Sequence, residues 1–366
     1  MKELYICDTP YQIMNVLNMV YHKQDDAERV LFVENNFRTA EHLVKKIEET
    51  QMFSSVCLLR KNKNRLISRG IIRYSRAMFD FLTPKLFMKA RLKDYPYVAE
   101  ELLAKKFDTV YISCFTPTTA SMIKLNPNAE TVLYDDGTGS YFGNLITRSG
   151  GLLNLIFCRV FHVGAYACKP SKLLVNNVSM CKNTTVPKDR IFPLPKLDND
   201  FIDFCKNIFD VDRKKRNSVF WFSQPIIAVS GAEEAREDMR SCLLPYRDKI
   251  TVRIHPRDLD GEFYRDFTLD YGRDMWELSV LNEKENEDSL ILIAGYSTAQ
   301  ITPKLLFDME PVLIFTHHLN RKEKEEQRKD IDQRIEDLRK SYRNPEKIYN
   351  PKTAEELSVI LKKLIL

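Results

Sequence analysis

The chain has 366 residues, of which 44% are hydrophobic and 29% are charged, and it carries a formal net charge of +5. This composition is that of a globular protein and excludes a disordered chain, while the length predicts two domains. The mild charge and the lack of a known binding signature argue against a nucleic-acid-binding protein. No apolar run reaches the roughly 20 residues that span a bilayer, and the first residues read as a strand rather than a secretory signal, so we expect a cytoplasmic protein.

The first half of the chain alternates short apolar segments with segments of helical periodicity. Segments rich in Val, Ile, Leu and Tyr predict strands at residues 4–7, 29–33, 55–59, 109–114 and 131–134. Apolar residues at helical spacing predict helices at 11–22, 39–50 and 97–105. Nearly continuous apolar strands joined by helices are typical of a parallel sheet that is covered on both faces. We expect a first domain over residues 1–195, because prolines at 193 and 195 mark a passage to the next domain.

The second half of the chain repeats this alternation. Strands are predicted at residues 218–222, 251–254, 290–294 and 312–315, and helices at 232–243, 274–281 and 298–307. These elements predict a second Rossmann-like domain over 196–350, so the fold class is α/β with two doubly wound domains. A long charged helix at 322–342 is either a solvated face or a candidate homodimer surface, and a helix at 351–366 should pack back onto the domains.

Basic residues are concentrated in one segment, residues 60–93. Eleven lysines and arginines there accompany a single early acid, Asp80, and phenylalanines and leucines are interleaved with them. Such a segment could contact an anionic membrane surface peripherally or hold an anionic acceptor. The alternative is a solvated basic face above ordinary core positions.

Two adjacent carboxylates follow the strand at 131–134. Asp135 and Asp136 cannot both ionise comfortably if they are partly buried, so one of them should have a raised pKa. A carboxylate of this kind can accept a proton from a sugar hydroxyl, and Gly137 allows a tight turn and the close approach of a ligand. The alternative is an ordinary Asp-Gly turn. A dinucleotide loop is rejected, because the third glycine is not at its proper place and the carboxylates would repel a pyrophosphate.

A histidine ends the strand at 251–254 in the second half. Arg253 and Arg257 flank His255 and Pro256, and this environment favours an anion such as phosphate. The imidazole could then donate a proton to a leaving phosphate, although a structural histidine is the alternative. We expect the acid of the first domain and the histidine of the second to meet across a cleft as base and acid.

Two further strand ends carry polar residues. Gly295 and Tyr296 follow the strand at 290–294, and Ser297 and Thr298 open the next helix, where hydroxyls and backbone N–H groups form a natural phosphate seat. The first loop follows the strand at 4–7 and should also face the cleft. Its residues are Thr9, Pro10, Tyr11 and Gln12. Ordinary helix capping is the alternative for both segments.

Several familiar motifs are absent from the sequence. It has no Gly-x-x-x-x-Gly-Lys phosphate loop, no His-Glu-x-x-His and no Gly-x-Ser-x-Gly. Asp-x-Asp pairs occur at 198/200, 210/212, 258/260 and 330/332, but chance explains most of them and none ends a convincing strand. We therefore expect no metal and no cofactor. The eight cysteines lack zinc-type spacing and read as reduced thiols.

Taken in order, these motifs resemble the bacterial sialyltransferases of glycosyltransferase family 52, which make lipooligosaccharide and capsular sialosides. The resemblance rests on Thr-Pro-Tyr-Gln at 9–12, Asp-Asp-Gly-Thr-Gly at 135–139, His-Pro at 255–256 and Ser-Thr at 297–298, and so spans about residues 5 to 300. It implies a GT-B fold, in which two Rossmann-like domains face a cleft. It also implies inverting, metal-independent transfer from CMP-sialic acid to a hydroxyl of an oligosaccharide or glycolipid acceptor.

The resemblance also implies roles for single residues. Asp136, with Asp135, matches the motif linked to the general base, and His255 matches the histidine that assists departure of CMP. Ser297 and Thr298 match the pair that contacts the donor phosphate. The remaining donor-side candidates are Ser223, Gln224, Pro256, Arg257, Gly295 and Tyr296, and the remaining acceptor or cleft candidates are Thr9, Pro10, Tyr11, Gln12, Gly137 and Thr138.

One departure from the family concerns the base. Some members place the base on a carboxylate shortly before His-Pro, whereas residues 222–227 hold no acid here. Either Asp136 takes the role or this branch uses another donor. Two other interpretations stay open: a GT-B transferase that uses another nucleotide sugar, such as a UDP-hexose, and a non-catalytic glycan-binding protein with the same fold.

Overall fold

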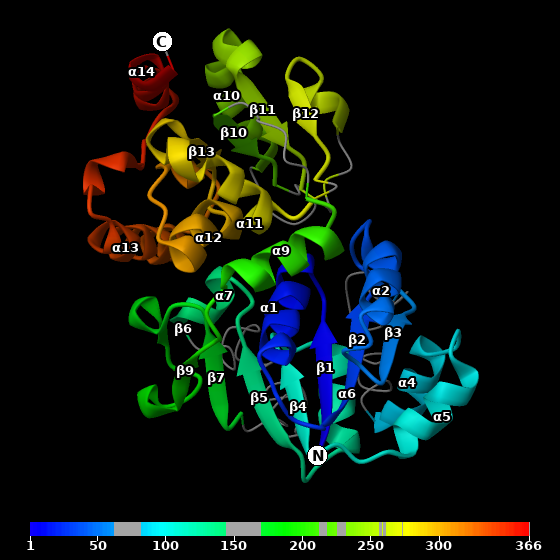
Figure 1. Cartoon of the computed structure of the whole chain (residues 1–366). Helices are drawn as coiled ribbons and strands as arrows, with labels where there is room; N and C mark the ends of the chain where they lie inside the picture. Colours follow the sequence, from blue (N-terminus) through cyan, green and yellow to red (C-terminus); the bar gives the residue numbers. More distant parts are fainter. Residues whose placement is uncertain are drawn as a thin grey trace. The chain divides into compact units, whose positions relative to one another are not determined.

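The computed structural model describes residues 1–61, 82–143, 170–211, 218–224, 232–255, 258, 261–272 and 274–365. The chain divides into two compact units, Met1–Ile208 and Phe209–Leu366, and each unit has a parallel sheet of its own (Figure 1). Among the described residues, no helix combines the length and the apolar composition needed to cross a membrane.

The first unit is built on a seven-stranded sheet in the order β3-β2-β1-β4-β5-β7-β9, with all pairs parallel. The strands are β1 (Lys2–Cys7), β2 (Glu28–Glu34), β3 (Ser55–Leu59), β4 (Thr109–Ile112), β5 (Glu130–Tyr134), β7 (Lys172–Val175) and β9 (Ile191–Pro193). A small pair is formed by β6 (Phe142–Gly143) and β8 (Lys182–Asn183). The helices are α1 (Pro10–Tyr21), α2 (Ala40–Glu49), α4 (Pro84–Arg91), α5 (Pro96–Ala104), α6 (Pro117–Leu125), α7 (Thr138–Tyr141), η3 (Val178–Met180), η4 (Lys188–Arg190) and α9 (Asn199–Ile208).

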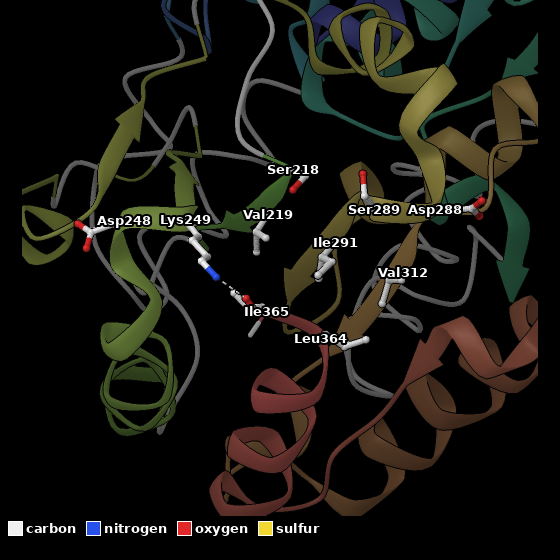
Figure 2. A pocket seen from close by; sticks show the side chains of 10 residues that line it. All are labelled: Ser218, Val219, Asp248, Lys249, Asp288, Ser289, Ile291, Val312, Leu364 and Ile365. Carbon is white, nitrogen blue, oxygen red and sulfur yellow. Dashed lines mark hydrogen bonds between the residues drawn. The ribbon is translucent and has the colours of Figure 1, made fainter.

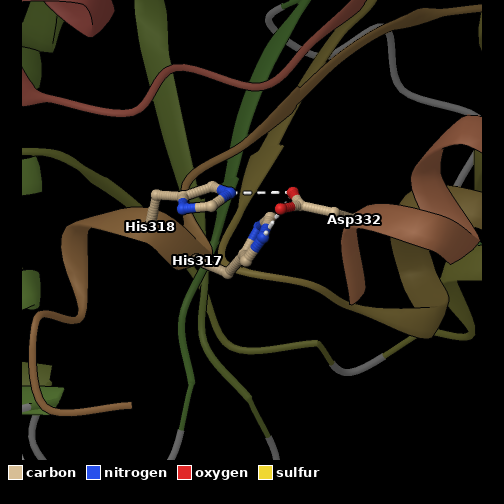
Figure 3. Close-up of side chains that lie close together, drawn as sticks. All are labelled: His317, His318 and Asp332. Carbon is tan, nitrogen blue, oxygen red and sulfur yellow. Dashed lines mark hydrogen bonds and ion pairs between the residues drawn. The ribbon is translucent and has the colours of Figure 1, made fainter. Parts of the chain in front are cut away.

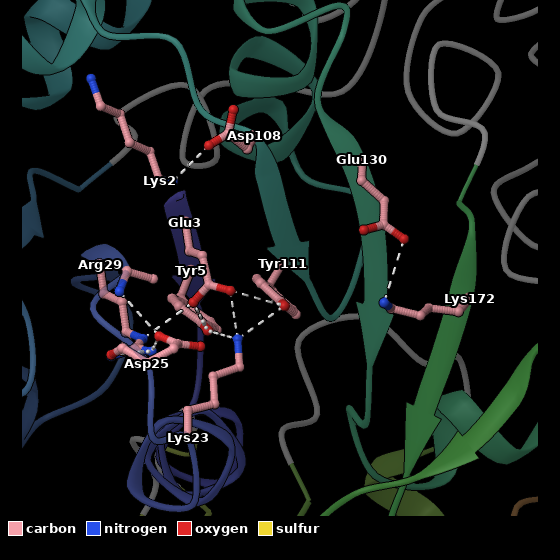
Figure 4. Close-up of polar contacts among 11 residues, drawn as sticks. Lys2, Glu3, Tyr5, Lys23, Asp25, Arg29, Asp108, Tyr111, Glu130 and Lys172 are labelled. Atoms are coloured by element: carbon pink, nitrogen blue, oxygen red, sulfur yellow. Dashed lines mark hydrogen bonds and ion pairs between the residues drawn. The ribbon is translucent and has the colours of Figure 1, made fainter.

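A buried ionic network lies toward the amino end of β1 (Figure 4). The Glu3 carboxylate accepts hydrogen bonds from Lys23 Nζ at 2.6 Å, Tyr5 Oη at 2.7 Å and Arg29 Nε at 3.2 Å. The rings of Tyr5 and Tyr111 stack with centroids 4.4 Å apart. Glu3 is buried with two cationic partners, so the network joins β2 and the segment just after α1 to β1. Loss of one partner would leave a buried charge without compensation.

The first unit extends beyond the expected boundary at residue 195. Helix α9 packs on α1, where the rings of Tyr21 and Phe201 lie 5.4 Å apart. Asn18 Nδ2 donates to the carbonyl of Pro195 at 2.7 Å, and Lys46 Nζ donates to the carbonyl of Asn207 at 2.8 Å. The prolines therefore lead into α9, and the unit ends at Ile208 because this helix covers α1 and α2.

The second unit is built on a six-stranded sheet in the order β12-β11-β10-β13-β14-β15, again with all pairs parallel. The strands are β10 (Val219–Phe222), β11 (Ile250–Arg253), β12 (Thr268–Asp270), β13 (Ile291–Ala294), β14 (Val312–Phe315) and β15 (Ile348–Tyr349). The helices are α10 (Ala232–Leu243), η6 (Leu244–Lys249), η7 (Gly261–Tyr264), α11 (Trp276–Ser279), η8 (Val280–Ser289), α12 (Thr298–Phe307), η9 (His317–Leu319), α13 (Glu325–Ser341), η10 (Pro345–Lys347) and α14 (Ala354–Ile365).

The C-terminal helix belongs to the second unit. Leu357 and Leu361 of α14 are fully buried in the same cluster as Trp221 of β10. The charged helix α13 presents two residues to the core, Ile335 and Leu338, while much of its remaining length carries charged side chains. The helix is thus anchored by a narrow apolar stripe, and its use as a dimer surface stays a prediction.

Candidate functional site

In the first unit, two of the motifs meet at the carboxyl ends of β1 and β5. The side chain of Gln12, in the first turn of α1, donates from Nε2 to Asp136 Oδ1 and accepts from the backbone N–H of Asp8. Thr9 caps α1 by accepting from the Gln12 N–H at 3.3 Å, so the capping alternative is correct for Thr9. The cap fixes the start of α1 and so places Gln12 beside Asp136.

The two neighbouring carboxylates lie in different environments. Asp135 is fully buried and accepts from the N–H of Gly137 at 2.7 Å, from Tyr141 Oη at 2.6 Å and from the N–H of Asn176 at 3.0 Å. Burial raises the pKa of Asp135, against the lowering effect of these donors. Asp136 is partly exposed. The carboxylate with the raised pKa is therefore enclosed, whereas Asp136 is partly open to solvent.

Gly137 forms the turn that separates these two side chains. Its φ of +85° lies in a region that side chains disfavour, so a glycine is required there. The N–H of Asp136 donates to Ser140 Oγ at 2.7 Å, and Thr138 is the first residue of the short helix α7. The Asp-Gly turn is thus real, but it serves to point Asp135 inward and leave Asp136 at the surface.

Asn176, which follows β7, was missed by the sequence analysis. Its Nδ2 lies 3.1 Å from each of Asp135 Oδ2, Tyr11 Oη and Asn15 Oδ1, and Asn15 Nδ2 donates to the Asp135 carbonyl at 3.1 Å. Tyr11 is buried. A signal for part of this network exists in the sequence: Gln12, Asn15 and Asn18 are spaced by three in an otherwise apolar helix, and all three are buried.

In the second unit, the remaining motifs lie at the carboxyl ends of β10, β11 and β13. The sheet order reverses between β10 and β13, and such a switch point is where open α/β sheets bind ligands. Gln224, after β10, donates from Nε2 to the carbonyl of Tyr296 at 3.0 Å. A Cβ on Gly295 would come within 2.6 Å of Gln224 Oε1. Glycine therefore permits the loops after β10 and β13 to lie against each other.

His255 is held through its backbone. Its N–H donates to Ser223 Oγ at 2.8 Å, while the N–H of Ser223 donates to the carbonyl of Arg253 at 3.0 Å. The residue is partly buried. Pro256 and Arg257 lie outside the described residues, so their predicted contact with the donor stays a prediction.

The interpretation of Arg253 as an anion-binding group needs correction. Its guanidinium donates to Asp270 Oδ2 at 2.7 Å, to Asp274 Oδ1 at 3.2 Å and to the Asp274 carbonyl at 2.6 Å, and the residue is buried. Two carboxylates already balance its charge, because parallel pairing of β11 with β12 places Asp270 beside it. Arg253 therefore supports the loop after β12 instead of attracting a phosphate.

Ser297 and Thr298 open α12 as predicted, and Ser297 is also its N-cap. Ser297 Oγ accepts from the Ala299 N–H at 3.3 Å, and the Gln300 side chain accepts from the Ser297 N–H, so the pair forms a capping box. Trp276, which sequence analysis did not single out, donates from Nε1 to the Ala299 carbonyl at 2.7 Å. The amino end of α12 is therefore fixed at the strand end, with the helix dipole directed to favour an anion.

The second unit also has a cavity of about 380 Å³, at the ends of the strands opposite those that carry the predicted site residues (Figure 2). It is lined by Ser218, Val219, Asp248, Lys249, Asp288, Ser289, Ile291, Val312, Leu364 and Ile365. Because Val219, Ile291 and Val312 begin their strands, the cavity lies at the amino ends of β10, β13 and β14. It includes none of the predicted site residues.

The sequence-predicted residues thus form one group within each unit. Asp136, Gln12, Tyr11, Thr9 and Gly137 gather in the first, with Asp135, Pro10 and Thr138 next to them in sequence. The second holds Ser223, Gln224, His255, Gly295, Tyr296, Ser297 and Thr298. Asp136 and His255 belong to different units, so their expected meeting as base and acid stays a prediction.

Comparison with known proteins identifies the fold. The glycosyltransferase CalG4, described as the calicheamicin glycosyltransferase, aligns with 100% of this chain and 89% of its own, with a TM-score of 0.52 and 9% identity. The UDP-GlcNAc 2-epimerase of Neisseria meningitidis aligns with 100% of this chain and 91% of its own, with a TM-score of 0.48 and 10% identity. MurG of Acinetobacter baumannii aligns with 100% of this chain and 91% of its own, with a TM-score of 0.45 and 9% identity. No protein-family model and no curated protein sequence matches the chain. The predicted fold class, α/β with two Rossmann-like units of the GT-B type, is confirmed.

Proposed function

We propose that this protein is a glycosyltransferase. It moves sialic acid from CMP-sialic acid to a hydroxyl of a cell-surface glycan, such as a lipooligosaccharide or capsule precursor. The observation that carries the proposal is the contact between Gln12 and Asp136. These residues belong to two motifs of the sialyltransferase resemblance that are 124 positions apart, and they come together at a strand edge where α/β enzymes bind substrates. The fold shared with CalG4 is compatible with this chemistry.

Asp136 acts as the general base in this proposal. Its partly exposed carboxylate accepts the proton of the acceptor hydroxyl as the hydroxyl oxygen attacks the anomeric carbon of the donor. Gln12 donates to one carboxylate oxygen and so orients the other toward substrate. Asp135 is too enclosed for this task and acts as a positioning residue, because its bonds to the Gly137, Tyr141 and Asn176 donors hold the turn in place.

The donor side is assigned to the second unit. As the bond between the anomeric carbon and the phosphate oxygen breaks, negative charge develops on the single phosphate of CMP. His255 donates a proton or hydrogen bond to that oxygen, and Ser297, Thr298 and the amino end of α12 stabilise the charge. A monophosphate leaving group can be stabilised by these donors alone, so the proposed transfer needs no metal.

The experiment that tests this assignment is a nucleotide-binding titration in which the intrinsic tryptophan fluorescence is the signal. Trp221 and Trp276 are the two tryptophans of the chain and both lie in the second unit, with Trp276 bonded to the first turn of α12. CMP should shift the fluorescence and, at 100 times its Kd, raise the free energy of unfolding by about 2.7 kcal/mol, with or without a chelator, so that the midpoint of thermal unfolding also rises. UDP, UMP and GDP should not.

The other outcomes separate the alternatives. Stabilisation by UDP would overturn the sialyltransferase assignment in favour of a transferase that uses a UDP-hexose. A lack of response to every nucleotide would favour a glycan-binding protein on this fold. Formation of sialylated product from CMP-sialic acid and a lipooligosaccharide acceptor would complete the positive result.

We also propose that the protein contacts an anionic membrane peripherally through residues 60–93. Residues 62–81 lie outside the described part of this segment. Leu82, two residues before α4, and Leu86, in its first turn, are each 57% exposed, and Lys85 and Lys89 lie four residues apart on α4. The protein should sediment with vesicles that contain phosphatidylglycerol, and Leu86→Asp should reduce this binding more than Val359→Asp, at an exposed valine of the second unit.

A further inference from the structure

Two histidines and an aspartate form a compact cluster in the second unit (Figure 3). His317 and His318 begin η9, just after β14, and Asp332 lies in α13. Both imidazoles direct Nε2 at the same carboxylate oxygen: Asp332 Oδ1 is 3.2 Å from His317 Nε2 and 2.8 Å from His318 Nε2. The three possible ligand atoms lie within 4.8 Å of one another, and none of the three residues belongs to the proposed donor site.

Hydrogen bonds alone do not satisfy this arrangement. Asp332 Oδ1 is also approached by Asn350 Nδ2 at 2.7 Å and by Lys352 Nζ at 3.2 Å, so four groups point at one oxygen that has two lone pairs. Lys352 Nζ lies only 2.6 Å from His318 Nε2. If His318 Nε2 carries a proton for Asp332, it cannot accept one from Lys352. The cluster therefore has more donors than its acceptors can use.

His317 is the most enclosed member of the cluster. Its side chain is 4% exposed, compared with 14% for His318 and 32% for Asp332. Its Nδ1 has no hydrogen-bond partner among the described residues, so the ring is held through Nε2 alone.

We propose that His317 Nε2, His318 Nε2 and Asp332 Oδ1 bind a divalent transition metal, for which zinc is the best fit. Two imidazole nitrogens and one carboxylate oxygen are a common zinc donor set, with a fourth position open to water. An ion at the centre turns all three atoms into lone-pair donors and so removes the excess of protons. Asn350 keeps its bond to Asp332 as an outer-shell partner.

In the metal-bound state Lys352 leaves the cluster. Its ammonium lies beside His318 Nε2 and Asp332 Oδ1, and because the side chain is half exposed it can extend into water when an ion binds. The bound ion would join η9 to α13 through its three ligands, and the bond from Asn350 to Asp332 would link the segment between β15 and α14 to the site. The site is structural and separate from sugar transfer, and its test requires no donor or acceptor.

The test is zinc titration of the full chain after treatment with a chelator. Calorimetry and metal analysis should find one ion per chain, and cobalt in its place should give the absorption spectrum of a four-coordinate site. His318→Ala and Asp332→Asn should each weaken binding at least as much as loss of an outer-shell partner, which costs about 10–100-fold. His42→Ala, at an exposed histidine of α2, should leave binding unchanged.

Lys352→Gln distinguishes a metal site from an ordinary hydrogen-bond cluster. Removal of the competing charge should tighten zinc binding by about fivefold or more, the factor that two unit charges about 4 Å apart contribute even in water. A folded Lys352→Gln protein that binds zinc no better than the wild type would overturn the proposal. So would the absence of stoichiometric zinc, or binding that survives both His318→Ala and Asp332→Asn.

Discussion

The two sheet edges hold their polar residues in different ways. In the first unit, side chains from α1, from the loop after β5 and from the loop after β7 bond to one another around Asp135. In the second unit, side chains bond to backbone groups at three strand-end points: the N–H of His255, the carbonyl of Tyr296 and the first turn of α12. A base needs one side chain fixed in direction, whereas a phosphate can be bound by N–H and hydroxyl groups that a helix start supplies.

The largest effect should follow from removing Asp136, the proposed base, in the first unit. Asp136→Asn keeps the shape of the side chain but cannot take a proton, so the turnover of CMP-sialic acid should fall by about 10²–10⁴-fold. The affinity for CMP, measured by tryptophan fluorescence, should stay within about twofold of the wild type, because the donor is assigned to the other unit. Asp203→Asn, at an exposed aspartate of α9, is the matched control. Near-normal turnover by Asp136→Asn would remove Asp136 from the mechanism.

A loss of comparable size should follow from His255→Ala in the second unit. The imidazole is assigned to the leaving phosphate, so its removal should lower kcat by about 10²–10⁴-fold while the fold stays intact. The backbone bond from His255 to Ser223 does not depend on the side chain, and the loop should therefore keep its position. The check is a comparison of kcat with CMP affinity. Equal losses in both would instead indicate that the imidazole contributes to donor binding without a role in catalysis.

The sequence predicted the central elements of both units well. Strands β3 and β14 and helices α10 and α12 have the predicted limits, because buried parallel strands are continuously apolar and helices with one apolar face have a clear period. Strands β7, β9, β12 and β15 were missed. β9, β12 and β15 have only two or three residues each, and so short a segment gives no usable periodicity.

The site residues were predictable only where one short segment carried the signal. The Gln12 and Asp136 motifs were identified separately, but nothing in the sequence placed them in contact, because that contact depends on how β5 is ordered relative to β1 in the sheet. The same limit explains Arg253, whose partners Asp270 and Asp274 lie 17 and 21 residues further along the chain. The same limit explains why Asp332 was not singled out: the sequence shows its Asp-x-Asp pair with Asp330, but not its contact with His317 and His318.

The units should differ in how pH changes their stability, through Asp135 in the first and Glu310 in the second. Burial opposes ionisation of Glu310, but hydrogen bonds from Lys304 and from the N–H groups of Arg343 and Asn344 lower its pKa to about 2. A lowered pKa stabilises the folded state above the ordinary value of 4.5, and this contribution is lost as the pH falls toward about 2. The raised pKa of Asp135 has the opposite sign, because its contribution is lost as the pH rises.

Glu310→Gln should therefore destabilise the second unit by about 3 kcal/mol at neutral pH, and the difference should shrink as the pH falls below 4.5. Urea unfolding monitored by tryptophan fluorescence reports on this unit alone, since both tryptophans belong to it. Asp288→Asn removes a well-exposed carboxylate paired with Lys347 and should change little. A difference between Glu310→Gln and wild type that is the same at pH 3 and pH 7 would contradict the assignment.

The smallest effect should separate the two tasks of Ser297. As the N-cap of α12 it contributes about 1 kcal/mol, which Ser297→Ala would lose, whereas Ser297→Gly should cost only a few tenths of a kcal/mol. Both variants remove the hydroxyl that the proposal assigns to the donor phosphate, and a hydrogen bond to a charged group contributes about 1.5 kcal/mol or more. The two variants should therefore lose the same affinity for CMP, about tenfold, while only the alanine variant unfolds at lower urea. If CMP affinity follows stability instead, Ser297 is a cap and the phosphate is held by the backbone of α12.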